Sequence, residues 1–335
     1  NTNNPTGILP LIPDYLSWEN GIFATISKKI NVVQFKSGIR YDFERQEALT
    51  ITNTLPKEIL RYKNNFQNIS GLLAWEVDIL DHQSISINSG LSMRNPGINE
   101  LYSFGLHQGV SGIEEGDVNI VSEVALKNIL EYKWLPSPSF SLSTLAYHQR
   151  FKDYIFLNPQ DEIRPTIRGS FPVFKYEQTD ASIYGVDFST QFTISNLIIG
   201  QVKYSYLRGD DTKNDVPLIY MPPSSVFGSL TYRTLNPINL SSKITLDEFE
   251  IELNNRMVFE QIHILAEQDF ISPPARYNLI GLKVSTNMLT PSYKVRLFVK
   301  ADNLLNAQYR DYLNRQRYFA DDEGISITMG VNFKF

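Results

Sequence analysis

The sequence predicts an all-β protein that folds as an antiparallel transmembrane β-barrel, with about thirteen strands in its 335 residues. Three observations support this fold class. Apolar and polar residues alternate along many segments, and these segments are about ten residues or longer. The connections between the segments alternate strictly between short turns and long polar loops. The expected domain organisation is a single β-barrel segment over residues 1–335.

The alternation is strictest near the C-terminus, in the stretch GISITMGVNFKF. Side chains of a β-strand point in turn to opposite faces, so this stretch has one apolar and one polar face. The apolar face consists of Ile325, Ile327, Met329, Val331, Phe333 and Phe335. The stretch IYGVDFSTQF repeats the pattern, with Tyr184, Val186, Phe188 and Phe192 opposite Asp187, Ser189 and Gln191.

The predicted strands lie near 16–28, 31–43, 67–80, 84–94, 119–133, 139–157, 175–192, 197–209, 224–234, 245–263, 275–288, 293–302 and 324–335. Short turns such as KKIN, LDHQ and TISN connect the strands at one end. Long polar connections occupy 44–66, 95–118, 158–174, 210–223, 264–274 and 303–323. In a transmembrane barrel, antiparallel strands place all short turns on one side of the membrane and all long loops on the other.

Composition excludes several other classes. With 42% hydrophobic and 20% charged residues, the chain can bury a large core and is not disordered. A net charge of -5 without a basic stripe gives no reason to expect nucleic acid as a partner. The absence of cysteine removes disulfides and thiolate metal sites. No apolar run approaches the length of a membrane-spanning helix.

A large soluble β-protein with aromatic core residues is the structural alternative, because it would also alternate. The order of the connections favours the membrane, where the 18 Tyr and 20 Phe would form aromatic girdles. An odd strand count conflicts with the even number by which bacterial single-chain barrels close. Since the chain starts NTNNPTGILP, with no initiator Met or signal-peptide pattern, we expect the native polypeptide to contain further strands upstream.

The stretch VRLFVKADNLLNAQYRDYLNRQRYFADDEGISITMGVNFKF resembles the C-terminal end of TonB-dependent outer-membrane receptors of the metal-chelate or siderophore type. Their penultimate strand ends in an Asn-Leu-Leu/Phe-Asn-x-x-Tyr signature, followed by an outward loop and a last strand ending in Phe. The matching residues here are Asp302, Asn303, Leu304, Leu305, Asn306, Tyr309 and Phe335. Asparagine side chains suit the capping of backbone where a strand ends. Further stretches in family order, including MRNPGINELYSF and YEQTDASIYGVDFS, extend the resemblance over most of 67–335.

The resemblance implies the C-terminal part of a roughly 22-stranded barrel, without its plug domain. It implies a multi-pass location in the outer membrane of a Gram-negative bacterium, contact with membrane lipid, and recognition of Phe335 by the barrel assembly machinery. It also implies import of a scarce metal chelate, such as a ferric siderophore, haem or zinc. A TonB-type energy transducer would drive import through a plug that this sequence does not contain. No intrinsic cofactor is expected, since the chelate is cargo.

Candidate ligand-binding residues lie in the long loops. His107 stands near Tyr102, Glu114, Glu115 and Asp117. Imidazole with carboxylates suits zinc, and imidazole or a tyrosine oxygen can bind haem iron. In haem receptors of the family, two short motifs flank a haem-binding His, and the corresponding stretches here, MRNP and DVNI, match them only poorly. The alternative to a ligand site is that His107 lies in an ordinary polar loop exposed to water.

The last loop offers Arg310, Arg315, Arg317 and Tyr318 for an anionic chelate, because guanidinium groups bind carboxylate and catecholate oxygens in pairs. Neighbouring aspartates indicate ordinary loop salt bridges as the alternative. Three other functions remain open: a SusC-like glycan receptor, a passive porin or adhesive barrel, and a barrel-based hydrolase. No Ser–His or Asp–His neighbourhood supports catalysis, so we predict that the protein is not an enzyme.

Overall fold

The computed structural model describes residues 2–3, 11–52 and 55–334, and within them one sheet contains eighteen strands. The strands are β1 (Thr2–Asn3), β2 (Asp14–Ile30), β3 (Val33–Ile51), β4 (Ile59–Leu80), β5 (Gln83–Arg94), β6 (Phe104–His107), β7 (Gly112–Glu115), β8 (Glu123–Ser137), β9 (Phe140–Thr166), β10 (Gly169–Ser195), β11 (Ile198–Asp211), β12 (Val216–Pro217), β13 (Ser225–Arg233), β14 (Ile238–Ser241), β15 (Ile244–Val258), β16 (Tyr277–Leu289), β17 (Lys294–Asp302) and β18 (Ser326–Lys334). The helical segments are α1 (Ile98–Tyr102) and the 3-10 turns η1 (Gln108–Val110) and η2 (Arg315–Tyr318).

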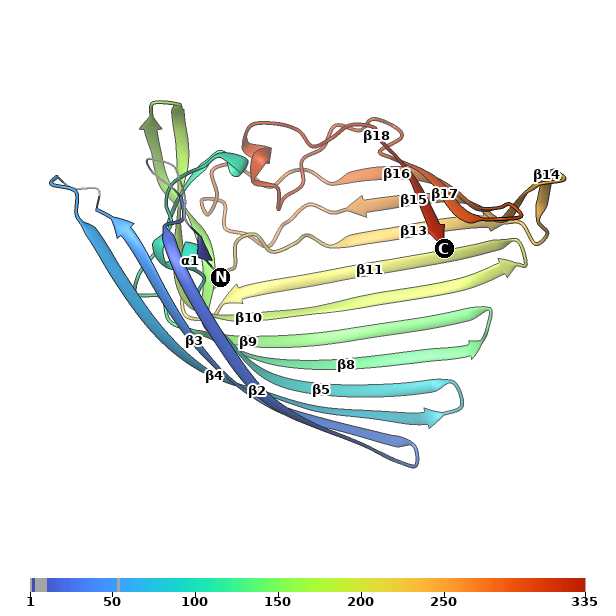
Figure 1. The fold of residues 1–335 in the computed structure, drawn as a ribbon, viewed down its shortest axis with the longest axis horizontal. Helices are drawn as coiled ribbons and strands as arrows, with labels where there is room; N and C mark the ends of the chain where they lie inside the picture. Colours follow the sequence, from blue (N-terminus) through green and yellow to red (C-terminus); the bar gives the residue numbers. More distant parts are fainter. Residues whose placement is uncertain (1, 4–10, 53–54, 335) are drawn as a thin grey trace.

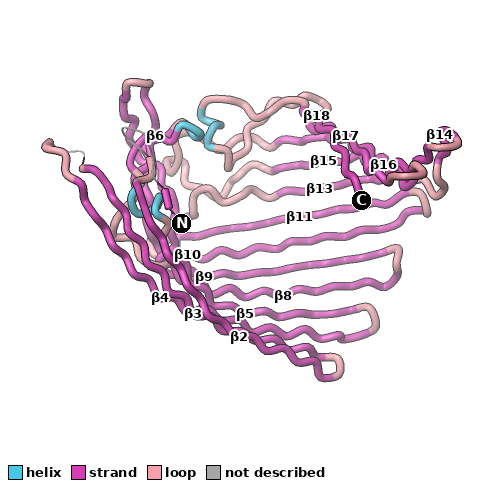
Figure 2. The backbone as a smooth tube through the Cα atoms, viewed as in Figure 1, coloured by secondary structure: helices cyan, strands magenta, loops and turns pink. Residues whose placement is uncertain are grey.

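The predicted fold class is confirmed. Thirteen of the described strands are nine residues or longer, and they follow the predicted strands in order. Each pairs antiparallel with the next long strand along the chain, from β2 to β18. The sheet curves strongly, with short turns gathered at one end and long connections at the other (Figures 1 and 2).

Two predicted loops are largely strand. In the segment 44–66, β3 continues to Ile51 and β4 already begins at Ile59. In the segment 158–174, β9 and β10 run on as a projecting hairpin that turns only between Thr166 and Gly169. Antiparallel pairing satisfies backbone donors and acceptors in water as well as in lipid, so the ladder continues past the apolar stretches. The alternation that predicts strands fades there because neighbouring residues such as Val173 and Phe174 are both buried.

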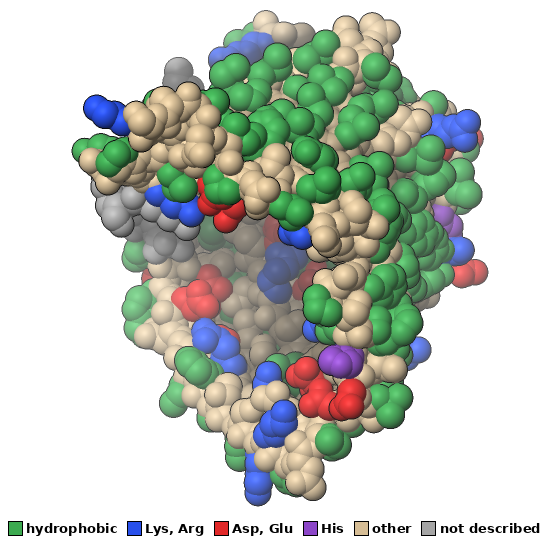
Figure 3. Space-filling view, turned by 90° about the vertical axis from the view of Figure 1, so that its right-hand side faces the viewer, with side chains coloured by type: hydrophobic (Ala, Val, Ile, Leu, Met, Phe, Trp, Pro, Cys, Tyr) green, Lys and Arg blue, Asp and Glu red, His purple; other side chains and the backbone are tan. Residues whose placement is uncertain are grey.

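The sheet has two chemically different faces. The face that carries Ile327, Met329, Val331 and Phe333, here called the apolar face, leaves these side chains 54–74% exposed. The register continues it across the sheet, for example through the facing residues Phe188, Tyr204 and Val226. Figure 3, viewed from the short-turn end, shows hydrophobic side chains over the outside and charged side chains inside a central hollow. None of the described helices is long and apolar enough to cross a membrane.

The opposite, polar face carries hydroxyl and charged groups. On β10 and β11, Asp187 accepts a hydrogen bond from the Ser205 hydroxyl at 2.6 Å. Lys203 lies over the ring of Phe227, 5.8 Å from its centroid. These four residues help to line a hollow of about 480 Å³ on this face. The two faces therefore have the distribution that a lipid-embedded, water-lined barrel wall requires.

Buried side chains gather at the long-loop end of the sheet. One buried cluster consists of Ala48, Ile98, Leu101, Tyr102, Ile120 and Ile155. A second consists of Ala181, Ile183, Leu218 and Met221. Both clusters join strand ends to the connecting segments, so the long connections fold into a compact layer over this end. This layer positions the candidate site.

Candidate binding site at the long-loop end

Four connecting segments meet at the long-loop end, and we call them together the loop assembly. They are the β6–β7 hairpin (104–115), and the segments 212–224, 259–276 and 303–325. The last of them, drawn in red, passes over the sheet toward the β6–β7 hairpin (Figure 1). Its 3-10 turn η2 supplies most of the contacts that connect the assembly.

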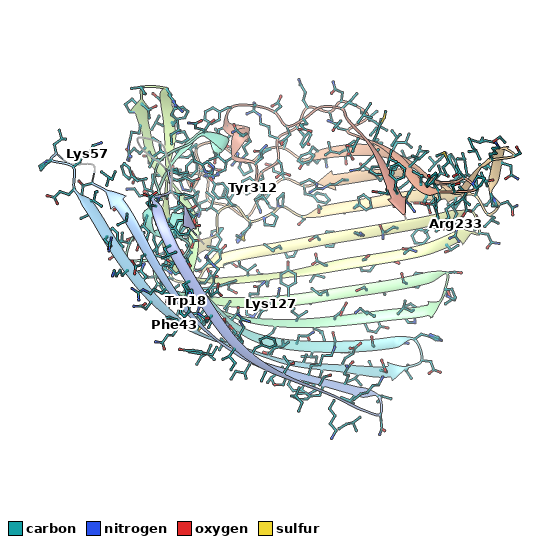
Figure 4. All side chains as sticks on the ribbon, in the orientation of Figure 1. Trp18, Phe43, Lys57, Lys127, Arg233 and Tyr312 are labelled. Atoms are coloured by element: carbon teal, nitrogen blue, oxygen red, sulfur yellow. The ribbon has the colours of Figure 1, made fainter. Side chains whose placement is uncertain are left out.

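An ion pair lies at the centre of the loop assembly. The guanidinium of Arg317 is fully buried and contacts the carboxylate of Asp269, whose side chain is only 2% exposed. The Tyr318 hydroxyl donates to the same carboxylate at 2.5 Å, and the hydroxyls of Tyr220 and Tyr318 lie 2.8 Å apart. The Arg317 guanidinium also lies 4.9 Å from the ring centroids of Tyr312 and Tyr318. Figure 4 labels Tyr312 on this last connection. A buried charge needs this density of partners to be tolerated.

Burial sets the protonation of the tyrosines around this ion pair. Burial raises the pKa of Tyr312 to about 12. Burial also raises the pKa values of Tyr220 and Tyr318, and the nearby carboxylate of Asp269 adds to both effects. Removing water disfavours the phenolate form, and a neighbouring negative charge disfavours it further. All three phenols are therefore neutral hydrogen-bonding groups at physiological pH.

A second set of contacts connects the last segment to the β6–β7 hairpin. The Oε1 atom of Glu114 lies 2.7 Å from Nη2 of Arg315 and 2.9 Å from Nδ1 of His107. The side-chain amide of Gln316 donates to the carbonyl of Gly109 at 2.6 Å. The Arg315 guanidinium lies 5.2 Å from the ring centroid of Phe174 on β10. Residues about two hundred positions apart in the sequence thus share one carboxylate.

The structure brings together His107, Glu114 and Arg315 from among the predicted residues, but it disperses the suggested metal ligands. Glu115 forms an ion pair with Arg164 at 2.6 Å, and Asp117 accepts hydrogen bonds from Asn119. Within the described part of the chain, no three His, Cys, Asp or Glu side chains are placed to hold a metal ion.

Tyr102 and Arg310 have structural partners. Tyr102 ends α1 in the buried cluster, and its hydroxyl accepts a hydrogen bond from the Asn64 amide at 2.6 Å. Arg310 pairs with Asp321 at 2.6 Å and donates to the Arg317 carbonyl at 2.7 Å. The Arg310 contact is the loop salt bridge that the neighbouring aspartates indicated.

The asparagine signature ends β17. Asn303 and Asn306 have φ values of 51° and 50°, in the left-handed region that asparagine tolerates better than most residues. The Asn303 side chain bonds both the carbonyl and the N–H of Ala307, at 2.9 and 2.8 Å. Leu304 donates its N–H to the Ile280 carbonyl, and the Tyr309 ring packs 4.6 Å from Tyr277. Phe335 lies outside the described residues.

Sequence reasoning missed Asp269, Tyr220 and Tyr312 around the central ion pair, and Phe174, whose ring lies against Arg315. Their roles depend on which loops pack together, so even Tyr312, inside the stretch that carries the family resemblance, gave no signal of its contact. An aspartate two residues before the Pro-containing segment ISPP gives no signal of a buried charge.

The family profile described as TonB dependent receptor-like, beta-barrel matches residues 1–304. The chain therefore belongs to this family of β-barrel receptors. Homologues with this barrel domain are outer-membrane proteins. A search of the curated proteins found no match.

Several solved structures share the fold. The copper transporter OprC superposes with a TM-score of 0.75 and 17% identity, over 96% of this chain and 49% of that one. The F3-3 variant of the FrpB iron transporter from Neisseria meningitidis gives 0.63 and 16%, over 97% and 46%. A double mutant of the Serratia marcescens hemophore receptor HasR, in complex with its hemophore HasA and heme, gives 0.66 and 14%, over 97% and 52%. This chain spans about half the length of each.

Proposed function

We propose that this chain is part of an outer-membrane receptor that imports a scarce metal chelate, driven by a TonB-type transducer. The observation that carries the proposal is the loop assembly, an ordered layer with a buried ionic centre over the open end of a polar-lined barrel wall. Proteins of similar fold are named as transporters or receptors for copper, iron and heme, which supports a metal-containing cargo. A passive pore would not need loops fixed by a buried ion pair.

Within this function, the partly exposed groups of the loop assembly are the proposed ligand contacts. The side chains of His107 and Arg310 are 42% and 39% exposed, and that of Arg315 is 18% exposed. Two guanidinium groups and an imidazole suit a chelate with anionic oxygen donors. We propose that the half-buried Tyr318 and the buried Tyr102 hold these loops in place and do not touch the chelate.

The proposed domain organisation follows the family. Residues 1–335 form a single barrel segment, and the plug and the segment that contacts the transducer lie outside this sequence. The chain's coverage of about half of OprC supports this division.

Growth of a strain lacking the gene tests the function. We expect a defect under limitation of iron, haem, zinc or copper, rescued by the gene only when the transducer is active. Metal analysis of the purified protein would identify the cargo. Rescue under none of these limitations would overturn the metal-chelate proposal. Rescue without the transducer would support the porin alternative, and a defect confined to growth on glycans would support the SusC-like one.

A further inference from the structure

Basic side chains extend the apolar face at the long-loop end of β9, β10 and β11. In one row of the sheet, Tyr184 on β10 faces His148 on β9 and Arg208 on β11. In the next row toward the loops, Ser182 faces Arg150 and Asp210. Lys152 follows on β9, opposite Val124 of β8.

The register places these groups on the apolar face. Val186 lies two residues from Tyr184 on the same face, and it faces Ala146 and Tyr206. Because side chains alternate along a strand, Ala146, His148, Arg150 and Lys152 all point to that side. The chemistry of the face thus changes within two rows, from apolar residues to a row with Tyr184 and His148, and then to charged residues.

Two of these cations have no counter-ion. Arg208 lies 3.4 Å from Asp210, and Asp210 also contacts His263 at 2.6 Å. Arg150 and Lys152 are exposed and form no ion pair or side-chain hydrogen bond in the part of the chain that the structure describes. The nearby carboxylate of Asp180 instead accepts from the backbone N–H of Asp153 at 3.1 Å.

The corresponding region of β3 and β4 differs. Arg45 faces Trp18 on the apolar face, beside the aromatic pair of Trp18 and Phe43. Glu47 neutralises this region, at 2.6 Å from Arg45 and 3.7 Å from Lys63. Of these two regions, the β9–β11 region is the one that combines an aromatic row with two cations lacking an acidic partner among the described residues.

We propose that Arg150 and Lys152 bind phosphate groups of lipid headgroups in the leaflet around the long-loop end of the barrel. The proposal rests on the outer-membrane location given above. An aromatic row marks the boundary between hydrocarbon and headgroups, so the next row lies at headgroup depth. A guanidinium binds phosphate through two parallel hydrogen bonds, and an ammonium adds a point charge. The acyl chains of such a lipid would lie along Leu130, Val186 and Tyr206.

The test uses the full protein that carries this chain, reconstituted in phosphatidylcholine nanodiscs containing either lipid A or lipid A stripped of its phosphates. Native mass spectrometry measures the lipid retained by the protein. We expect the wild type to prefer the phosphorylated form, and the Arg150→Gln/Lys152→Gln variant to lose roughly thirtyfold in that preference. The matched control, Arg61→Gln/Lys63→Gln on β4, should keep it.

Equal preference in the wild type and the β9 variant, or equal retention of both lipids by the wild type, would overturn the lipid site. Inorganic phosphate that abolishes the preference at millimolar concentration would instead indicate a site for free phosphate, and would overturn it too. Growth rescue is measured with the same variants, and we expect the β9 variant to rescue growth fully. A wild type that rescues growth but shows no lipid preference would overturn only the lipid site. A wild type that shows the lipid preference but does not rescue growth would overturn only the proposed function.

Discussion

Arg317 is the residue on which the loop assembly depends most. It is fully buried and paired with a carboxylate that is itself buried, so removing either partner leaves an uncompensated charge. We predict that Arg317→Met destabilises the loop assembly by about 3–5 kcal/mol, while the strand ladder remains. Hydrogen exchange would show the loss as faster exchange in 259–276 and 303–325.

The control for this change is Arg310→Met. Arg310 and Asp321 are 39% and 44% exposed, and an exposed pair contributes about 0–1 kcal/mol. Comparable exchange in the two variants would contradict the central role of the buried ion pair.

The tyrosines near Arg317 predict how the loop assembly responds to alkaline pH. Burial raises the pKa of Tyr312 from the ordinary tyrosine value of about 10 to about 12. The folded state binds the proton more tightly, so this stabilisation is complete below about pH 10 and is lost as the pH rises through about 12. Tyrosinate absorbance, followed together with protease sensitivity of the loops, would show both changes in that interval. Loosening already near neutral pH would contradict this reasoning.

At this scale the sequence indicated candidate residues but not how they pack. His107, Glu114 and Arg315 could be named because metal and anion chemistry is recognisable in single loops. Asp269 and Tyr220 could not, because their roles arise from packing between loops far apart in the sequence. A residue's charge can be read from sequence, whereas its burial depends on the assembled tertiary structure.

Among the elements, the β6–β7 hairpin and the last connection form the contact most open to a direct test. Glu114 bonds both Arg315 and His107, so Glu114→Gln removes a charged acceptor that contributes about 1.5–3 kcal/mol. We predict that the hairpin and the last connection then separate. Because the sequence has no cysteine, spin labels at Gln108→Cys and Phe319→Cys can report the distance between them.

The adjacent carboxylate supplies the control for that experiment. Glu115 pairs with Arg164 and Lys175 and makes no contact with the last connection. Glu115→Gln should leave the distribution of distances between the two labels narrow. A broadened distribution in both variants would contradict a specific role for Glu114.

The thirteen long strands were predictable where one face meets lipid and the other meets water, because that contrast produces strict alternation. The extensions of β3, β4, β9 and β10 were not, since residues in them such as Ala48 and Phe174 are buried against connecting segments and follow no regular period. The β6–β7 hairpin was missed for another reason. Its four-residue strands are too short to show a period, and β7 is fixed by parallel pairing with β10.

For the whole molecule, the decisive property is the difference between the two faces of the sheet. Met329 and Thr328 are neighbours on β18 that point to the apolar and the polar face, respectively. We predict that Met329→Arg costs about 2–4 kcal/mol of stability in a bilayer, while Thr328→Arg costs far less. Folding into lipid vesicles, followed by the mobility of unheated samples in gel electrophoresis, would measure both. Equal costs would exclude lipid as the solvent of the apolar face.

The shared carboxylate of Glu114 also determines when the loop assembly can form. Its partner Arg315 follows 201 residues later, and most of the strand ladder lies between them. Contacts this distant carry a large entropic cost until the intervening chain is ordered, and neighbouring strands pair at much lower cost. Neighbouring strands should therefore pair one hairpin after another as the barrel folds. The loop assembly should form last, after the strands beneath it have paired.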